Sequence, residues 1–233
     1  MLKDIYNSII PLNIFQTWHT HDLPPLMKQN CDLMKNSNPK FNYYLFDDND
    51  CREFIKNNFD EPILNAYDSL IPGAYKADLW RYCVLYINGG IYVDIKYKCI
   101  NNFEFISLTE QEHFVKDRPE NYVYNALISS KPKNQILLMC IKKIVENVNN
   151  KYYGNNALEP TGPGLLGKYF LKKEIDAMHL YFIIILINNK EIDTIRYKNI
   201  NILECYDGYR DEQKYYQKNY RYNILWDNEN IYE

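Results

Sequence analysis

Residues 77–97 (ADLWRYCVLYINGGIYVDIKY) constrain the fold more than any other part of this chain. Apolar residues recur at helical spacing in the first half, and an Asn-Gly-Gly tripeptide then supplies a helix stop. The second half is a short β-branched run, residues 91–94, that ends in a carboxylate. In open α/β sheets, ligands bind in the crevice beyond the carboxyl ends of the strands. We therefore expect Asp94 at the mouth of a pocket, with Asp78 and Arg81 on the preceding helix.

Length, net charge and composition limit the functions that are open to this chain. Its 233 residues suffice for one substantial domain. A net charge of −3, from 27 basic and 30 acidic residues, provides no global field for nucleic acid or an anionic membrane. The six cysteines form no closely spaced pair, which favours reduced thiols. The composition, rich in Tyr, Asn, Ile and Lys, is typical of an AT-rich genome such as a viral or protist one.

Neither a signal peptide nor a membrane anchor is evident. The first residues lack a sustained apolar run. The most apolar segment, Leu180–Ile187, is far shorter than the roughly 20 residues that span a bilayer, and we expect it to be a buried strand. Together with the starting Met, these features favour a cytoplasmic location.

Helical and strand patterns alternate along the chain, which predicts an α/β fold. Strands are expected at residues 13–18, 41–46, 91–94, 97–100, 113–115, 123–129, 180–187, 192–197 and 200–205. Helices are expected at residues 26–34, 47–58, 61–70, 77–88, 134–147 and 161–172. The apolar face of the helix at 134–147 comprises Ile136, Leu137, Met139, Cys140, Ile144 and Val148.

A longer pattern surrounds Asp94. The string D-x-x-R-x-x-x-L-x-x-x-G-G-I-Y-x-D, from Asp78 to Asp94, resembles the central signature of family 32 glycosyltransferases. That family uses nucleotide sugars, includes initiating mannosyltransferases and is related to clostridial toxin catalytic domains. The resemblance implies a GT-A-type nucleotide-sugar-binding sandwich, with a central, mostly parallel sheet flanked by helices. It also implies one domain, in which residues 1–100 mainly bind the nucleotide sugar and residues 101–233 form the acceptor side and a closing segment.

One position departs from the family pattern. Where the family has a second Asp, this chain has Lys96, two residues after Asp94 and on the same face of an extended segment. The lysine could supply a fixed positive charge near the diphosphate, or the site could be damaged. Alternatively, a divalent cation, Mn²⁺ or Mg²⁺, is retained and bound by Asp94 together with Asp227 and Asn228. We favour the retained cation.

The resemblance also assigns donor-binding residues. Gln16, Thr17 and Trp18 are similar to the family's segment that holds the nucleotide base, although Trp18 could equally be core. Asp47 resembles an element near the ribose, although helix capping explains it nearly as well. The remaining donor-binding residues lie within the central pattern: Asp78, Arg81, Gly89, Gly90, Tyr92 and Asp94. His19 and His21 have no metal-ligand partner at useful spacing, so we interpret them as loop residues.

The turn Thr161-Gly162-Pro163 is similar to the family's acceptor-side turn. The resemblance then implies a retaining hexosyltransferase acting on a UDP- or GDP-sugar and on a hydroxyl of a glycan, lipid or protein. Asp94, Arg81 and Lys96 would be its catalytic residues, as stabilisers of the leaving diphosphate. The alternative is a non-catalytic nucleotide-sugar or glycan-binding module, for which Lys96 is the main support.

Overall fold

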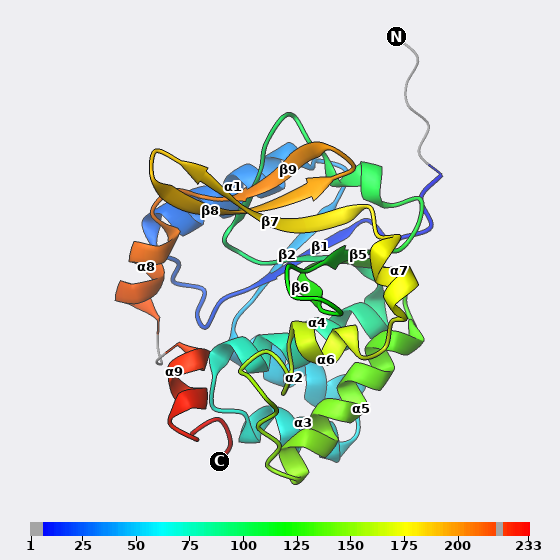
Figure 1. The fold of residues 1–233 in the computed structure, drawn as a ribbon, viewed down its shortest axis with the longest axis vertical. Helices are drawn as coiled ribbons and strands as arrows, with labels where there is room; N and C mark the ends of the chain where they lie inside the picture. Colours follow the sequence, from blue (N-terminus) through cyan, green and yellow to red (C-terminus); the bar gives the residue numbers. More distant parts are fainter. Residues whose placement is uncertain (1–6, 218–220) are drawn as a thin grey trace.

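One curled sheet organises the computed structural model, which describes residues 7–217 and 221–233 (Figure 1). The strands of the described chain are Asn13–Thr17 (β1), Asn42–Phe46 (β2), Gly90–Val93 (β3), Tyr97–Cys99 (β4), His113–Lys116 (β5), Val123–Ser130 (β6), Leu180–Ile187 (β7), Lys190–Tyr197 (β8) and Ile200–Cys205 (β9). They follow the order β2-β1-β3-β6-β5-β7-β8-β9-β4. The predicted strands therefore exist, with ends shifted by at most two residues.

The mixed α/β architecture is confirmed, but the prediction of a mostly parallel sheet is wrong. Among the described strands, only β1–β2, β1–β3 and β5–β7 pair in parallel. β6 enters antiparallel between β3 and β5, and β7, β8 and β9 form a meander. Short turns join these last three strands, and short turns can connect only antiparallel neighbours. Periodicity along one strand carries no information about the direction of its neighbour.

The strand order requires the sheet to curl. β3 is third and β4 ninth in that order, yet only Asp94, Ile95 and Lys96 lie between them in the chain. The four residue steps from Val93 to Tyr97 span at most about 14 Å. The far edge of the sheet must therefore return to the end of β3. Figure 1 shows β7, β8 and β9 arching over the other labelled strands.

Helices cover the two faces of the sheet unequally (Figure 1). The described helices are Pro25–Ser37 (α1), Asp48–Asn58 (α2), Glu61–Ser69 (α3), Gly73–Asn88 (α4), Gln135–Asn149 (α5), Pro163–Gly167 (α6), Lys172–Asp176 (α7), Tyr209–Tyr216 (α8) and Tyr222–Asp227 (α9), with a 3-10 turn at Phe105–Leu108 (η1). α2, α3, α4 and α5 share one apolar core on one face. α4 is apolar and buried on nearly all sides, as expected of a helix enclosed within a core.

Local signals set the helix ends. Asp47 caps α2 in a capping box with Asp50, and Asn134 caps α5 through the backbone N–H groups of Ile136 and Leu137. Gly89 ends α4 at φ 61°, a conformation that favours glycine. Both the predicted capping and the predicted Gly-Gly stop are therefore confirmed.

Three details differ from the sequence predictions. β7 is buried only at Leu180, and its far end forms an exposed ribbon in which Leu186 is 69% exposed. On α5, Met139 is exposed and Ile141 takes its place in the core. The helix expected at 161–172 is broken after Gly167, and α7 starts separately at Lys172. Among the described residues, no helix is both long and apolar enough to cross a membrane.

Candidate active site

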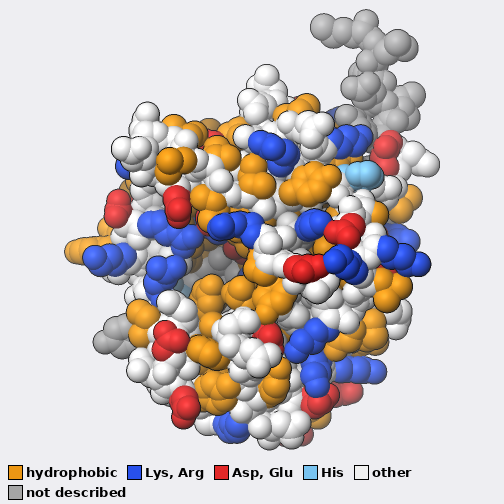
Figure 2. Space-filling model, viewed as in Figure 1, with side chains coloured by type: hydrophobic (Ala, Val, Ile, Leu, Met, Phe, Trp, Pro, Cys, Tyr) orange, Lys and Arg blue, Asp and Glu red, His pale blue; other side chains and the backbone are white. Residues whose placement is uncertain are grey.

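A cavity of about 320 Å³ lies beside α4 and the ends of β1 and β3, and this size is typical of small-molecule sites. Figure 2 shows a hollow at this place, with Lys and Arg side chains along its rim. Many parts of the chain line it: the end of β1, the start of α2, Tyr67 of α3, one face of α4, residues 92–96, residues 124–126 of β6, the loop at 157–163, and α8 with the start of α9. Segments far apart in the sequence therefore meet around one space.

The parallel strands explain why polar residues gather here. β1 pairs with β2 so that Thr17 lies opposite Phe46, and Phe15 lies opposite Tyr92 of β3. The carboxyl ends of all three strands therefore meet at the same edge. The residues that follow them, Trp18, Asp48 and Asp94, line the cavity. Asp94 therefore lines a pocket beyond the end of its strand, as predicted, although it lies at the floor of that pocket and not at its mouth.

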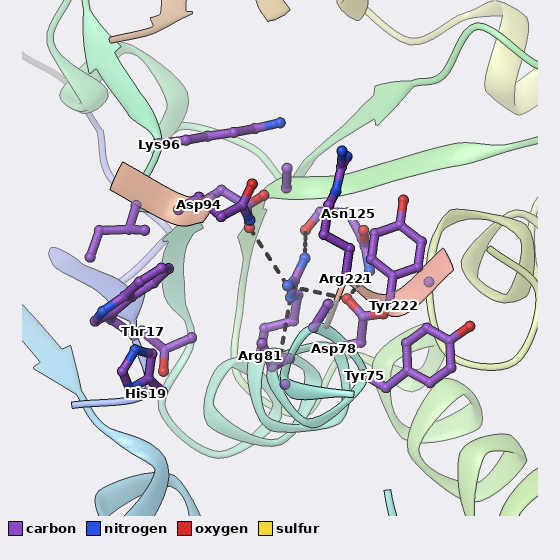
Figure 3. Close-up of a pocket in the computed structure, with 18 of the residues that line it drawn as sticks. Thr17, His19, Tyr75, Asp78, Arg81, Asp94, Lys96, Asn125, Arg221 and Tyr222 are labelled. Atoms are coloured by element: carbon purple, nitrogen blue, oxygen red, sulfur yellow. Dashed lines mark hydrogen bonds and ion pairs between the residues drawn. The ribbon is translucent and has the colours of Figure 1, made fainter. Parts of the chain in front are cut away.

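Arg81 joins the residues that form the floor of this cavity (Figure 3). Its guanidinium lies 3.1 Å from Asp78 and 3.6 Å from Asp94, and Nη1 donates to the Asn125 carbonyl oxygen at 2.8 Å. The same group stacks over the Tyr92 ring, 4.3 Å from the centroid. A side chain with only 6% exposure thus holds two carboxylates and a neighbouring strand in place. The i,i+3 pair of Asp78 and Arg81 is therefore part of a wider network.

Asp78 is the buried end of that network. Its carboxylate accepts hydrogen bonds from Asn125 Nδ2 at 2.9 Å and Thr161 Oγ1 at 2.7 Å. Burial raises the pKa of this carboxyl above its ordinary value, although Arg81 and the two hydrogen bonds oppose the rise. Thr161 therefore lies behind Asp78, whereas Gly162 and Pro163 line the cavity itself. The predicted acceptor-side turn is in contact with the predicted donor-binding helix.

Asp94 is the most accessible carboxylate of the floor network. Its side chain is 28% exposed, and Oδ1 accepts from the Tyr92 hydroxyl at 2.9 Å. Arg81 approaches the same oxygen, so one face of the carboxylate is held while the other faces the cavity (Figure 3). A fixed carboxylate in this position can bind sugar hydroxyls or a cation.

Two buried amide side chains hold the link from Asp94 to Lys96. Gln16 Nε2 donates to the carbonyl oxygens of Val93 and Asp94, both at 3.3 Å. On the other side, Asn30 Nδ2 donates to the carbonyl oxygens of Ile95 and Tyr97, both at 2.9 Å. Gln16 is completely buried and does not line the cavity. Its place is behind the site, where it positions Asp94.

Lys96 faces the cavity but is already paired. Its ammonium lies 2.6 Å from Asp193 Oδ2 on β8, and Arg210 of α8 reaches the same oxygen at 2.9 Å. Burial alone would lower the pKa of Lys96. The interactions with Tyr124 and with the carboxylates of Asp193 and Asp94 outweigh burial and raise that pKa above its ordinary value. Lys96 is therefore a fixed cation of the site.

Several predicted residues do not line the cavity. Asp47 acts as the cap of α2, and Gly89 and Gly90 shape the turn between α4 and β3. A Cβ atom on Gly90 would lie 2.7 Å from the Asn13 carbonyl oxygen, so this glycine permits close packing of β3 against β1. Thr17 and Trp18 do line the cavity, and the ring of Trp18 lies 4.9 Å from that of His19. Of the three residues predicted to hold the nucleotide base, Thr17 and Trp18 therefore line the cavity and Gln16 does not.

The predicted metal ligands are not brought together. Asp227 and Asn228 are exposed at the end of α9 and do not line the cavity. Asp94 has two cations beside it, Arg81 and Lys96, and Asp193 is occupied by its own two cations. Divalent cations in proteins require several oxygen ligands. The donor set around Asp94 therefore does not fit the divalent cation that the sequence led us to favour.

His21 has partners that sequence spacing did not reveal. Its Nε2 lies 2.6 Å from Asp50 Oδ2 and 3.8 Å from Asp47 Oδ2. Within the described chain, this is the one group of three potential ligands whose atoms converge, and it does not line the cavity. Asp47 and Asp50 already serve as capping partners, which gives the group a structural explanation.

The structure adds cavity residues that the sequence did not identify: Tyr75, Asn125, Arg210, Arg221 and Tyr222. It also adds Asp193, which pairs with Lys96 but does not line the cavity itself. Tyr75 lies on α4, one helical turn before Asp78, but the others lie on elements that reach the cavity only through tertiary folding. In the sequence, Arg221 and Tyr222 at the start of α9 look like any other residues of a polar terminal segment.

Comparisons with known proteins agree with this geometry. Residues 24–115 match the family model described as a glycosyltransferase sugar-binding region containing a DXD motif. A glycosyltransferase of Acanthamoeba polyphaga mimivirus is 30% identical over 162 residues, which cover 67% of this chain and 63% of the relative. Inositol phosphoceramide mannosyltransferase 3 of Schizosaccharomyces pombe is 34% identical over 110 residues, which cover 42% of this chain and 30% of the relative. The chain thus spans less than two thirds of the length of either relative.

A solved structure supports the fold. The PaToxG glycosyltransferase matches with a TM-score of 0.53 at 20% identity, over 68% of this chain and 67% of that one. Residues 24–115 include α4, β3 and the Asp94–Lys96 link, so the matched region contains the floor of the cavity. Residues 24–115, with the floor of the cavity, are therefore similar to the glycosyltransferase sugar-binding region that contains a DXD motif.

Proposed function

We propose that this chain is a retaining glycosyltransferase that moves a hexose from a nucleotide-sugar donor to an acceptor hydroxyl. The observation that carries the proposal is the network of Asp78, Arg81 and Asp94 on the cavity floor, within the family-matched region. A carboxylate that is held yet partly exposed can fix sugar hydroxyls. A guanidinium beside it can stabilise the negative charge of a leaving diphosphate.

The two sides of the cavity suggest where the substrates bind. Thr17 and Trp18 stand at one side, where an indole can stack on a nucleotide base. Gly162, Pro163, Tyr75 and Tyr222 stand at the other, where Figure 3 shows the two tyrosine rings side by side. Aromatic rings are suited to the apolar faces of sugars. We assign the first side to the donor nucleotide and the second to the acceptor.

The mechanism we propose requires no protein nucleophile. The bond from the anomeric carbon to the diphosphate breaks, and the acceptor oxygen forms its new bond on the same face of the sugar. The acceptor proton passes to the departing phosphate oxygen. Arg81 and Lys96 would stabilise the charge that develops on that oxygen, and Asp94 would orient the sugar.

The names of the relatives indicate which substrates to test first. Two curated relatives, both of Schizosaccharomyces pombe, are named as inositol phosphoceramide mannosyltransferases. We therefore propose mannose as the hexose, with GDP-mannose as the first donor and a lipid-linked hydroxyl as the first acceptor.

The test is donor turnover by the purified chain. GDP-mannose, UDP-glucose, UDP-galactose and UDP-N-acetylglucosamine are incubated with and without mannose-accepting glycolipids, and released nucleotide and anomeric configuration are measured. Slow hydrolysis of one donor, accelerated by an acceptor and giving a product that retains the donor configuration, supports the proposal. An inverted product would contradict the mechanism, and release of no nucleotide from any donor would contradict the activity.

The second candidate function is a nucleotide-sugar-binding module without turnover. Lys96, in place of the second carboxylate of the motif, is the observation that favours it. Tight binding of a donor, with no hydrolysis even after prolonged incubation, would select this function over the first.

A further inference from the structure

The pair of Asp94 and Lys96 has the same formal charge as a complete metal-bound motif. Two carboxylates with a bound divalent cation have a net formal charge of zero. One carboxylate and one ammonium also have a net formal charge of zero, without any ion. Replacing a carboxylate by an ammonium therefore changes the local charge by as much as binding the divalent cation would. The diphosphate of a donor would meet a similar electrostatic environment in both cases.

The surroundings of Lys96 make this charge a fixed feature. Its side chain is only 10% exposed, and Asp193 and the rings of Tyr97 and Tyr124 surround it, with the ring centroids 5.1 and 5.6 Å from Nζ. The carbonyl oxygen of Lys96 accepts from the Tyr206 N–H at 3.0 Å, so its backbone is held as well. A cation positioned in this way loses little freedom when an anion binds.

A second cation stands beside the first. Arg210 lies 2.9 Å from the same Asp193 oxygen, lines the cavity and is half exposed, with 52% of its side chain accessible. Asp193 therefore holds the ammonium of Lys96 and the guanidinium of Arg210 together. The three side chains have a net positive charge, because two cations share one carboxylate. Arg221, also exposed, lines the same cavity from the start of α9 (Figure 3). Phosphate oxygens are well suited to ammonium and guanidinium donors.

We propose that Lys96 and Arg210, oriented by Asp193, bind the donor diphosphate directly, so that this chain binds its nucleotide sugar without a divalent cation. The inference rests on the proposed function, because it concerns the donor of that same site. It goes beyond that function by identifying the groups that replace the metal. Asp193 acts as a positioning residue, since it touches the two cations and not the ligand.

The first experiment needs no variant. Binding of UDP, GDP and GDP-mannose to the full chain is measured by calorimetry, once in EDTA and once in Mn²⁺. We expect one nucleotide to bind with a dissociation constant that changes by no more than about twofold between the two buffers. Binding that requires Mn²⁺ would overturn the inference and leave the proposed function intact. No binding of any nucleotide in either buffer would overturn both.

The second experiment tests whether restoring the second carboxylate makes nucleotide binding depend on a divalent cation. Lys96→Asp restores the two carboxylates of the family motif. It should weaken binding in EDTA by about tenfold or more, and Mn²⁺ should restore part of the loss. Lys98→Asp is the matched control: it makes the same charge change two residues further on, outside the cavity lining, and should retain wild-type binding in EDTA. Equal losses in the two variants would show a general charge effect and would contradict the inference.

A third variant tests the inference without changing the buried Lys96, whose replacement could disturb folding. Arg210→Gln changes a half-exposed side chain, so we expect the melting temperature of the free protein to stay within a few degrees of the wild type. Nucleotide binding in EDTA should weaken by about fivefold, and its salt dependence should become shallower because one phosphate contact is lost. An unchanged affinity would exclude Arg210 from the diphosphate site.

Discussion

Arg81 contacts more of the site than any other side chain described above. It joins Asp78 and Asp94, donates to the backbone of Ala77 and Asn125, and stacks on Tyr92. Removing one partner of a buried ion pair leaves an uncompensated charge and costs about 3–5 kcal/mol. At this position, a change of side-chain geometry should therefore affect stability as well as chemistry.

We predict that Arg81→Lys lowers the free energy of unfolding by about 2–3 kcal/mol, because an ammonium cannot reproduce the planar set of donors. Denaturant unfolding measures the loss. Arg52→Lys is the control, since Arg52 forms its pair with Asp68 at an exposed position and should leave stability nearly unchanged. Equal stability of the two variants would show that the floor network is not a structural element.

Asp94→Asn separates chemistry from stability. The replacement keeps the shape of a side chain that is partly exposed, so we expect the melting temperature to change little. Transfer activity should fall by about a hundredfold or more, because the carboxylate that orients the sugar is lost. Asp22→Asn, at an exposed position away from the cavity lining, should leave both quantities at wild-type values. A large loss of stability in Asp94→Asn would identify Asp94 as structural.

At the residue scale, the sequence predicted the part of the site that lies on one continuous segment. Asp78 and Arg81 lie on α4 and Asp94 directly follows β3, and the helix–turn–strand pattern of this segment predicted that they share one pocket. Asn125 and Asp193 reach the same site from β6 and β8, at sequence distances for which no local rule exists. The metal-ligand prediction for Asp227 and Asn228 depended on the family resemblance, and the geometry does not support it.

At the scale of elements, α8 depends on a contact with α1. Glu212 accepts from the backbone N–H groups of Leu26 and Met27 at 2.7 and 2.9 Å and from the Tyr206 hydroxyl at 2.9 Å. It thereby caps the first turn of α1, for which the chain supplies no local side-chain cap. The same helix carries Tyr209 and Arg210 into the cavity. One carboxylate therefore joins two helices at the edge of the site.

We predict that Glu212→Gln lowers the free energy of unfolding by about 1–2 kcal/mol, because hydrogen bonds to a charged acceptor are lost. It should also weaken nucleotide binding, since α8 would no longer be held where Arg210 faces the cavity. Asp211→Asn, on the exposed side of the same helix, is the control and should change neither quantity. Unchanged nucleotide affinity in Glu212→Gln, measured by calorimetry, would show that α8 keeps its place without this contact.

At the scale of the whole molecule, the sequence identified the elements better than their arrangement. The strands of the described chain were expected at nearly the observed positions, yet most neighbouring pairs are antiparallel, because β6, β8 and β4 run opposite to the other strands. β7 illustrates the same limit, because its apolar run predicted burial, whereas only Leu180 is buried and the last two residues are exposed. Local patterns report what a segment can form, whereas layer and direction depend on distant partners.

Stability should depend on pH through His113, which packs against the Tyr197 ring in the interior. Burial, together with His179 and Lys198, lowers the pKa of this imidazole from 6.5 to about 4. Between these pH values the unfolded chain binds a proton that the folded chain does not. The contribution of His113 is therefore complete above about pH 6.5 and is lost as the pH falls toward 4.

We predict that the free energy of unfolding of the wild type falls relative to that of His113→Gln by on the order of 2 kcal/mol from pH 6.5 to pH 4. Burial raises the pKa of Asp117 to about 6, so this carboxyl stabilises the fold as the pH falls and opposes the effect of His113. Asp117 is present in both proteins, so the comparison cancels its effect. Denaturant unfolding at several pH values provides the measurement. Parallel curves for the two proteins would contradict the prediction.

The short link between β3 and β4 has a consequence for sequence variation. Asp94, Ile95 and Lys96 span the distance between the third and the ninth strand of the curled sheet, and both neighbouring strands are fixed. Exchanging a side chain here changes charge and ligand preference while the path of the backbone stays the same. Inserting or deleting a residue would shift β4 out of register with β9 and turn its side chains to the opposite face. The backbone of the link is therefore constrained in length, so new chemistry at positions 94 and 96 can arise by point replacement but not by insertion or deletion.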